Sequence, residues 1–214
     1  ASGRSVRELS REPAVPGRHL KTTLDLGLQE TAMRRLSAER EGAAVVVDVG
    51  NGGILALAST PSFDPNAFVG GLSAQAWKAL VADPDRPLLN RAIGGEYAPG
   101  STFKMTVALA GLDGGVVGPD HTVYCPGYYR LGDSIFHCWK RQGHGRLAMV
   151  EAIAQSCDVY FYDLALRAGV ERIADMARRL GFGETFDLGL PGERPGLVPT
   201  EAWKRATLGG AWQK

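Results

Sequence analysis

The chain has 214 residues, 44% of them hydrophobic, and its 24 basic and 23 acidic residues leave a formal charge of +1. This composition is typical of a globular protein with a sizeable core, and the near-neutral charge without a basic stripe argues against a nucleic-acid partner. The longest apolar runs, such as residues 43–49, are far shorter than the roughly 18 residues that a membrane-spanning helix needs.

The first 18 residues are polar and end in Pro-Ala-Val-Pro-Gly-Arg, which is typical of a linker or of the tail of a preceding domain. We therefore expect the folded part to begin near His19. Residues 24–36 carry apolar side chains at helical spacing, with Thr or Asp as the candidate cap, and this pattern predicts an amphipathic helix.

Two apolar runs, residues 43–49 and 54–60, flank the turn signal Asn51-Gly52. An Asn-Gly between β-branched runs predicts an antiparallel hairpin. Residues 61–87 carry Pro-rich turn signals on both sides of a predicted short helix around Trp77.

The stretch "EYAPGSTFKM" places Ser101 three residues before Lys104, at the start of an apolar run that ends at Gly114. The run predicts a helix buried inside the domain. Random placement gives roughly 0.3 Ser-x-x-Lys pairs in a chain of this composition, so the pair alone is a weak signal. Ser101 could serve only as a helix cap. Alternatively, because positions i and i+3 share a helix face, Ser101 could be a nucleophile with Lys104 as its base.

Burial of the helix start favours the second alternative. Burial disfavours an ammonium ion, which would let a neutral Lys104 take the proton of the Ser101 hydroxyl. Free backbone N–H groups at a helix start can also stabilise an oxyanion. A cap requires neither property, and a buried Lys with no role would be costly.

The second half of the chain begins with residues 116–146, rich in Gly, aromatic residues and Cys, for which we predict an irregular segment with short strands at best. Residues 147–183 show helical spacing, and residues 187–214 are predicted to be loop-like. Within the helical part, Ser156 and Asp158 stand two apart at a helix entry. A Ser-x-x-Lys followed by Ser-Asp-Asn and Lys-Thr-Gly is typical of serine β-lactamases and penicillin-binding proteins.

Longer stretches of the chain strengthen this link. "HLKTTLDLGLQETA", "GAAVVVDVGNGGILALASTPSFDPN", "LNRAIGGEYAPGSTFK" and the segment from "WKRQGHGRL" to "SCDVYFYDLA" resemble consecutive blocks of the transpeptidase domain of class B penicillin-binding proteins. "WKRQGHGR" and "VPTEAWK" are most similar to the elongation-type members of that family. The resemblance covers about residues 17–214 in order, so it outweighs a cap-only role of Ser101.

The resemblance implies an α/β fold of the α+β type, the penicillin-binding transpeptidase or serine β-lactamase-like fold, with an antiparallel sheet and a buried central helix. Residues 19–214 would form its N-terminal portion. The implied activity is D,D-transpeptidation of peptidoglycan in cell-wall elongation. The implied partners are stem peptides, β-lactams and membrane proteins of an elongation complex, and the implied location is the periplasm.

The same resemblance implies a role for each site residue. Ser101 attacks the D-Ala-D-Ala carbonyl, and its N–H forms half of the oxyanion hole. Lys104 is the base, and Ser156 relays a proton to the leaving amine. Asp158 stands where the family usually has Asn, and its charge would favour the ammonium form of Lys104. Either Asp158 contacts substrate and stays clear of Lys104, or Lys104 works mainly as a cation that positions Ser101.

The sequence contains no Lys-Thr-Gly or Lys-Ser-Gly, the third motif of the family. We therefore expect the chain to be a fragment that is nearly inactive alone, with an inner-membrane anchor in a preceding part and the remaining core strands in a following part. A β-lactam-hydrolysing or D,D-carboxypeptidase relative, or a non-catalytic β-lactam sensor or scaffold, remains the alternative. Transpeptidation of stem peptides separates these functions.

Three cysteines, an odd number, cannot all form internal disulfides. Unpaired thiols are a liability in the oxidising periplasm that the resemblance implies. Three thiolates and an imidazole form a standard closed zinc site, so we expect one structural zinc ion; its ligands would be Cys125, Cys138, His144 and Cys157. Asp133 or His137 could replace a ligand. The rival interpretation is a disulfide between Cys125 and Cys138 with Cys157 a buried thiol.

Overall fold

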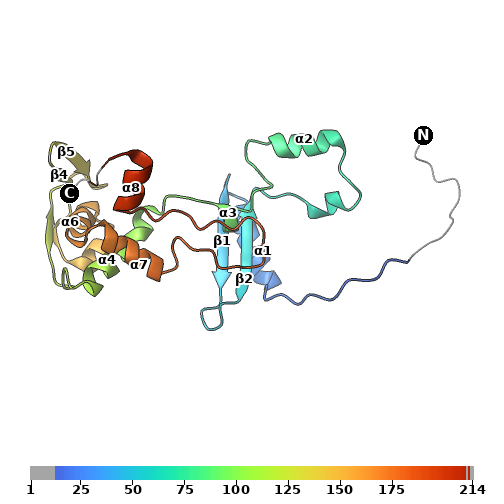
Figure 1. The fold of residues 1–214 in the computed structure, drawn as a ribbon, viewed down its shortest axis with the longest axis horizontal. Helices are drawn as coiled ribbons and strands as arrows, with labels where there is room; N and C mark the ends of the chain where they lie inside the picture. The colour runs from blue at the N-terminus through green and yellow to red at the C-terminus, as the bar shows by residue number, and fades with distance from the viewer. Residues whose placement is uncertain (1–12, 211, 213–214) are drawn as a thin grey trace. The chain divides into compact units, whose positions relative to one another are not determined.

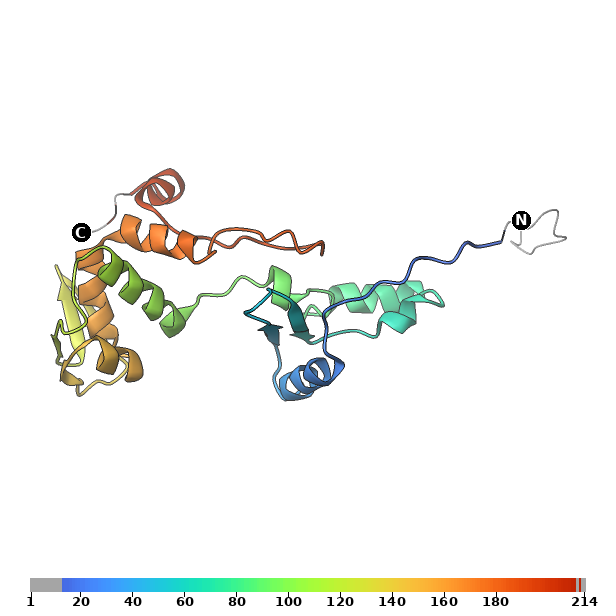
Figure 2. The same ribbon diagram turned by 90° about the horizontal axis from the view of Figure 1, so that it is seen from below.

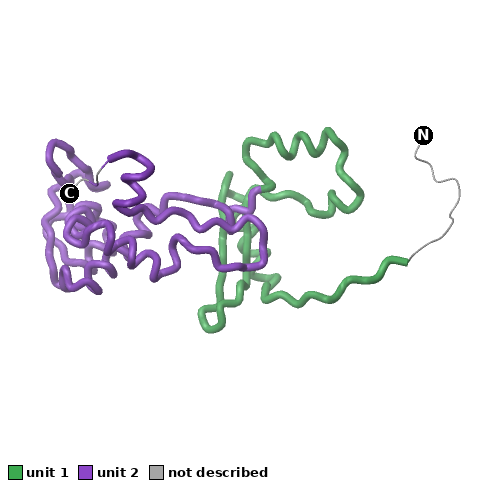
Figure 3. The backbone as a smooth tube through the Cα atoms, in the orientation of Figure 1, with its two compact units in different colours: residues 1–88 green, residues 89–214 purple. Residues whose placement is uncertain are grey.

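The computed structural model describes residues 13–210 and 212. The chain divides into two compact units, residues 1–88 and 89–214 (Figure 3), and each is described by itself. Of the predicted linker, residues 1–12 lie outside the described part, and residues 13–18 are exposed with neither helix nor strand. The prediction that residues 19–214 form one portion of a domain stays a prediction.

The first unit contains the predicted helix and hairpin. Helix α1 (Leu26–Leu36) begins where the Asp25 carboxylate accepts a hydrogen bond from the N–H of Leu28, so Asp25 is its cap. Strands β1 (Gly42–Val47) and β2 (Ile54–Thr60) pair antiparallel around the Asn-Gly turn, which confirms the hairpin.

The rest of this unit is a 3₁₀ turn, η1 (Pro65–Phe68), and helix α2 (Ala74–Ala82), which Ser73 caps. The rings of Phe68 and Trp77 meet edge to face, with centroids 6.4 Å apart. The short helix predicted around Trp77 is confirmed.

The second unit is mainly helical (Figures 1 and 2). Its helices, in chain order, are α3 (Arg91–Gly94), η2 (Gly100–Phe103), α4 (Lys104–Asp113), α5 (Met149–Ala154), α6 (Asp158–Ala168), α7 (Val170–Arg179) and α8 (Glu201–Leu208). Helix α4 packs against both α6 and α7. Helix α8 shows that the loop prediction for residues 187–214 is wrong in part: the Thr200 hydroxyl accepts from the N–H of Trp203 and caps a helix.

Helix α4 is buried on one face only. Val107 and Ala110 are buried, whereas Met105, Leu109 and Leu112 are 56%, 44% and 38% exposed. The sequence predicted burial nearly all round, because apolar residues occupy most positions of the helix. Within the described residues, the helices that pack against α4 do not cover its other face.

The segment predicted to be irregular forms two small antiparallel ladders. Strand β3 (Val123–Cys125) pairs with β6 (Gly145–Leu147), and β4 (Tyr128–Leu131) pairs with β5 (Ser134–His137). Between the ladders, Gly143 has a φ of +81°, and a Cβ there would clash with the carbonyl of Cys125. Only glycine allows this approach of two backbones, which brings the loop before β6 onto the end of β3.

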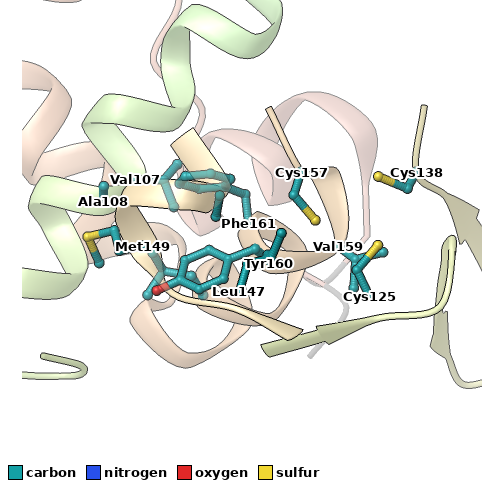
Figure 4. Packing of buried hydrophobic residues seen from close by; sticks show 12 residues of the cluster. Val107, Ala108, Cys125, Cys138, Leu147, Met149, Cys157, Val159, Tyr160 and Phe161 are labelled. Atoms are coloured by element: carbon teal, nitrogen blue, oxygen red, sulfur yellow. The ribbon is translucent and has the colours of Figure 1, made fainter. Parts of the chain in front are cut away.

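The core of the second unit lies between α4, α6 and the β3–β6 ladder (Figure 4). Tyr160 and Phe161, two aromatic residues of α6, are buried there. All three cysteines belong to the same buried cluster. The core therefore reaches directly from the start of α6 to the cysteines.

Candidate active site

Ser101 lies on the 3₁₀ turn η2, immediately before α4. Neither η2 nor α4 has a side-chain cap, so the interpretation of Ser101 as a helix cap is wrong. Its Oγ instead accepts a hydrogen bond of 2.9 Å from the hydroxyl of Ser156, 55 residues further along the chain. Ser101 is thus part of a hydroxyl pair joining two segments.

Lys104, the first residue of α4, points toward the start of α6. Its Nζ donates to three acceptors: the carbonyl of Ser156 at 2.8 Å, the hydroxyl of Ser156 at 3.0 Å, and Oδ1 of Asp158 at 2.6 Å. The side chain is only 13% exposed. The link from Ser101 to Lys104 therefore runs through Ser156.

Ser156 lies in the short connection between α5 and α6 and has a φ of +50°. This left-handed conformation is uncommon for residues other than glycine. Backbone hydrogen bonds hold the connection on both sides: the N–H of Ser156 donates to the carbonyl of Ile153, and the N–H of Cys157 donates to that of Ala152. The unusual backbone directs both the carbonyl and the hydroxyl of Ser156 toward Lys104.

Asp158 begins α6 and uses both carboxylate oxygens. Oδ1 accepts from Lys104 and Oδ2 accepts from the backbone N–H of Trp139 at 2.9 Å. Burial raises the pKa of Asp158, but the hydrogen bonds from Lys104 and Trp139 and the charge of Lys104 outweigh burial and hold that pKa below its ordinary value. Asp158 does not stay clear of Lys104, so the first of the two alternatives for this residue is wrong.

A second group of side chains lies beside the site. One ligand atom from each of the four predicted zinc ligands falls within 4.8 Å of all the others, and the group comprises Cys125, Cys138, His144 and Cys157. Figure 4 shows the three cysteine side chains gathered at one side of the core. Asp133 and His137 do not belong to the group.

Two distances within this group agree with a tetrahedral zinc ion. Nδ1 of His144 lies 3.6 Å from Sγ of Cys125 and 3.5 Å from Sγ of Cys138. Zinc–sulfur and zinc–nitrogen bonds of about 2.3 and 2.05 Å at tetrahedral angles place such atoms about 3.6 Å apart. The three cysteines are free thiols in this structure, and burial raises the pKa of Cys157 to about 12. The donor set therefore fits zinc in type, and the two nitrogen–sulfur distances agree with a tetrahedral site.

Sequence reasoning missed one residue of the site, Trp139. Its indole Nε1 donates to the carbonyl of Gln155 at 3.1 Å, its backbone N–H donates to Asp158, and its ring meets that of His144. In the sequence, Trp139 follows Cys138, a predicted ligand, and it begins the stretch "WKRQGHGR" that resembles the elongation-type members.

Comparison with known proteins identifies the family. Residues 42–212 match the model of the penicillin-binding protein transpeptidase domain. The peptidoglycan D,D-transpeptidase MrdA of Escherichia coli is 39% identical over 212 residues, which cover 98% of this chain and 33% of that protein. MrdA of Acinetobacter baumannii is 43% identical over 211 residues, covering 98% of this chain and 31% of that protein. The chain thus spans about a third of the length of these relatives.

Solved structures agree. PBP2 of Pseudomonas aeruginosa is 45% identical with a TM-score of 0.82, and the match covers 89% of this chain and 43% of that one. PBP2 of Helicobacter pylori, solved in complex with MreC, is 37% identical with a TM-score of 0.83 over 88% of this chain and 36% of that one. These neighbours confirm the predicted fold class. The chain belongs to the penicillin-binding protein transpeptidase family, as part of the transpeptidase domain of its elongation-type class B branch, penicillin-binding protein 2.

Proposed function

We propose that this chain carries the acylation centre of a peptidoglycan D,D-transpeptidase that cross-links stem peptides during cell-wall elongation. The single observation that supports it most is the continuous hydrogen-bonded path from Ser101 through Ser156 to Lys104 and Asp158. A nucleophile needs a route for its proton, and this path offers one.

In this proposal Lys104 acts as a cation. A Lys ammonium has three N–H donors, and the three acceptors around Nζ use all of them. A neutral amine would have only two donors and would leave one of these acceptors without its bond. Lys104 therefore stabilises the negative charge that develops on the Ser101 and Ser156 oxygens, and Asp158 holds the ammonium in place.

In the proposed acylation, Ser156 relays a proton from Ser101 to the leaving group. As the Ser101 Oγ bonds to the D-Ala-D-Ala carbonyl carbon, its proton passes to the Ser156 oxygen, and the Ser156 proton passes to the nitrogen of the leaving D-Ala as the C–N bond breaks. A hydroxyl both donates and accepts, so the same pair can reverse. The amine nitrogen of a second stem peptide then bonds to the ester carbonyl carbon, the bond from that carbon to the Ser101 Oγ breaks, and a proton of the amine passes through Ser156 to the Ser101 oxygen. A β-lactam acylates Ser101 by the same first step.

We extend the proposal to partners and location by analogy with the relatives. A PBP2 solved in complex with MreC supports protein partners of an elongation complex, and the MrdA relatives, named peptidoglycan D,D-transpeptidases, support action on peptidoglycan. A periplasmic location belongs to the same proposal. Tethering to the inner membrane is part of this proposal. None of the described helices has the length and apolar character needed to span a bilayer.

Two assays on the full-length protein test the proposed function. Mass spectrometry after treatment with penicillin is expected to find the acyl adduct on the peptide that contains Ser101. Incubation with pentapeptide and an amine acceptor is expected to release D-Ala and join the two peptides. An adduct without joined peptides would indicate a β-lactam sensor, and released D-Ala without joined peptides would indicate a carboxypeptidase.

We also expect the 214-residue chain by itself to be acylated more slowly than the full-length protein, by a factor of about 10² to 10³. The chain contains no Lys-Thr-Gly, which in this family supplies the second oxyanion donor, and losing one such donor costs about that factor. Acylation rates of the two proteins, measured side by side with one penicillin, check this. Equal rates would contradict it.

The four-residue Cys and His cluster supports a structural zinc ion as a second proposal. Cys125, Cys138, His144 and Cys157 would hold the metal, which would supply a cross-link and no reaction chemistry, because a site closed by four protein ligands leaves no position for substrate. Cys157 stands between Ser156 and Asp158, so the cross-link would fix the second catalytic motif to the β3–β6 ladder.

A further inference from the structure

Trp139 forms hydrogen bonds on both sides of Ser156, in the connection between α5 and α6. Its backbone N–H donates to Asp158, two residues after Ser156, at 2.9 Å. Its indole Nε1 donates at 3.1 Å to the carbonyl of Gln155, directly before Ser156. Trp139 thus holds the carbonyl of Gln155 on one side of Ser156 and the carboxylate of Asp158 on the other.

The contact with Gln155 bears on the conformation of Ser156. Gln155 is the C-cap of α5, where backbone carbonyls have no partner within the helix. This carbonyl belongs to the peptide plane that contains the nitrogen of Ser156, and the orientation of that plane sets φ of Ser156. Holding the carbonyl therefore favours the left-handed φ of +50° at which the Ser156 hydroxyl reaches Ser101.

Packing does not account for this arrangement. Trp139 is 64% exposed, whereas the aromatic residues of the core, such as Tyr160, are fully buried. The exposed indole of Trp139 therefore contributes little to the core. Its single N–H donates to the carbonyl of Gln155, the residue directly before Ser156.

We propose that Trp139 is a positioning residue for acylation: its indole N–H holds the Gln155 carbonyl and so keeps Ser156 in reach of Ser101. The inference rests on the proposed function, because it assumes that Ser101 is acylated with the help of Ser156. It adds a residue that contacts neither Ser101 nor the reacting atoms.

Two replacements in the full-length protein test the role. Trp139→Phe keeps a ring and loses the donor, and replacement of Trp139 by benzothienylalanine keeps the shape of indole and loses only the N–H. We expect both to lower the first-order acylation rate constant with penicillin roughly 3- to 10-fold, the effect of one neutral hydrogen bond. The noncovalent dissociation constant and the titre of acylatable sites are expected to stay unchanged. Trp77, a half-exposed Trp of the first unit, supplies the matched control: Trp77→Phe is expected to leave the acylation rate constant, the dissociation constant and the titre unchanged.

Each other outcome overturns the role. A weaker dissociation constant with an unchanged rate constant would make Trp139 a wall of the substrate site. A lower titre or melting temperature with an unchanged rate constant per active site would make it a structural residue. An unchanged rate constant with benzothienylalanine would exclude the N–H. Wild-type protein that penicillin does not acylate would overturn the proposed function, a result distinct from all of these.

Discussion

Ser101→Ala is expected to abolish covalent labelling of the full-length protein by penicillin. The variant removes the only atom that forms the acyl bond, and loss of a catalytic Ser costs on the order of 10⁶-fold in serine enzymes. The fold is expected to survive, because Ser101 is exposed, caps no helix, and contributes its hydroxyl to a hydrogen bond with Ser156. A fluorescent penicillin followed by gel electrophoresis measures the labelling, and circular dichroism checks the fold.

Ser134→Ala is the control for this experiment. Ser134 begins β5 in the same unit and is exposed, so the same substitution there is expected to leave labelling intact. Labelling that persists in the Ser101 variant would contradict the assignment of the nucleophile, whatever the behaviour of the control. For Ser101→Ala we expect a folded variant that is not labelled by penicillin and does not join stem peptides.

Local features of the fold could be predicted from the sequence. The carboxylate of Asp25 and the Asn51-Gly52 turn act on residues within a few positions of themselves, so capping and turn preferences suffice to find α1 and the β1–β2 hairpin. Helix α8 was missed although Thr200 caps it by the same chemistry, because Pro and Gly signals on its N-terminal side predict a loop.

The contacts of the active site were beyond local reasoning. Helical spacing predicted that Ser101 and Lys104 share a helix face, but the hydrogen-bonded path between them runs through Ser156 on a distant segment. Whether Asp158 would contact Lys104 could not be predicted either. Pairing across more than 50 residues depends on how α4 and α6 pack, and periodicity within one element does not encode that packing.

The cysteine cluster was predicted by a different kind of reasoning. Its spacing along the chain matches no short zinc motif, so the prediction used the number of cysteines and the chemistry of an oxidising compartment. The structure brings the four residues within 4.8 Å, through the backbone approach at Gly143 and the entry of α6. Trp139 lacked any such chemical signal, and its role depends on hydrogen bonds that only the fold creates.

The zinc proposal predicts one tightly bound zinc ion per chain and a large loss of stability when it is removed. The four ligand atoms come from β3, the segment after β5, the loop before β6 and the N-cap of α6, so the ion would tie together a segment with short ladders and little core of its own. Loss of a structural metal belongs to the changes that cost more than about 4 kcal/mol. Elemental analysis of protein purified without added metal, and urea unfolding before and after chelation, measure both.

His144→Ala supplies the matched test, because it removes one ligand and leaves all three thiols. We expect it to weaken zinc binding by at least about 100-fold, because the variant keeps only three of the four protein ligands and water can enter the fourth position. His137→Ala, at an exposed His outside the cluster, is expected to bind zinc as the wild type does. Thiol alkylation distinguishes the rival disulfide: zinc protects all three cysteines until chelation exposes them together. Two cysteines that stay unreactive until a reductant is added, in protein without stoichiometric metal, would establish the disulfide between Cys125 and Cys138 instead.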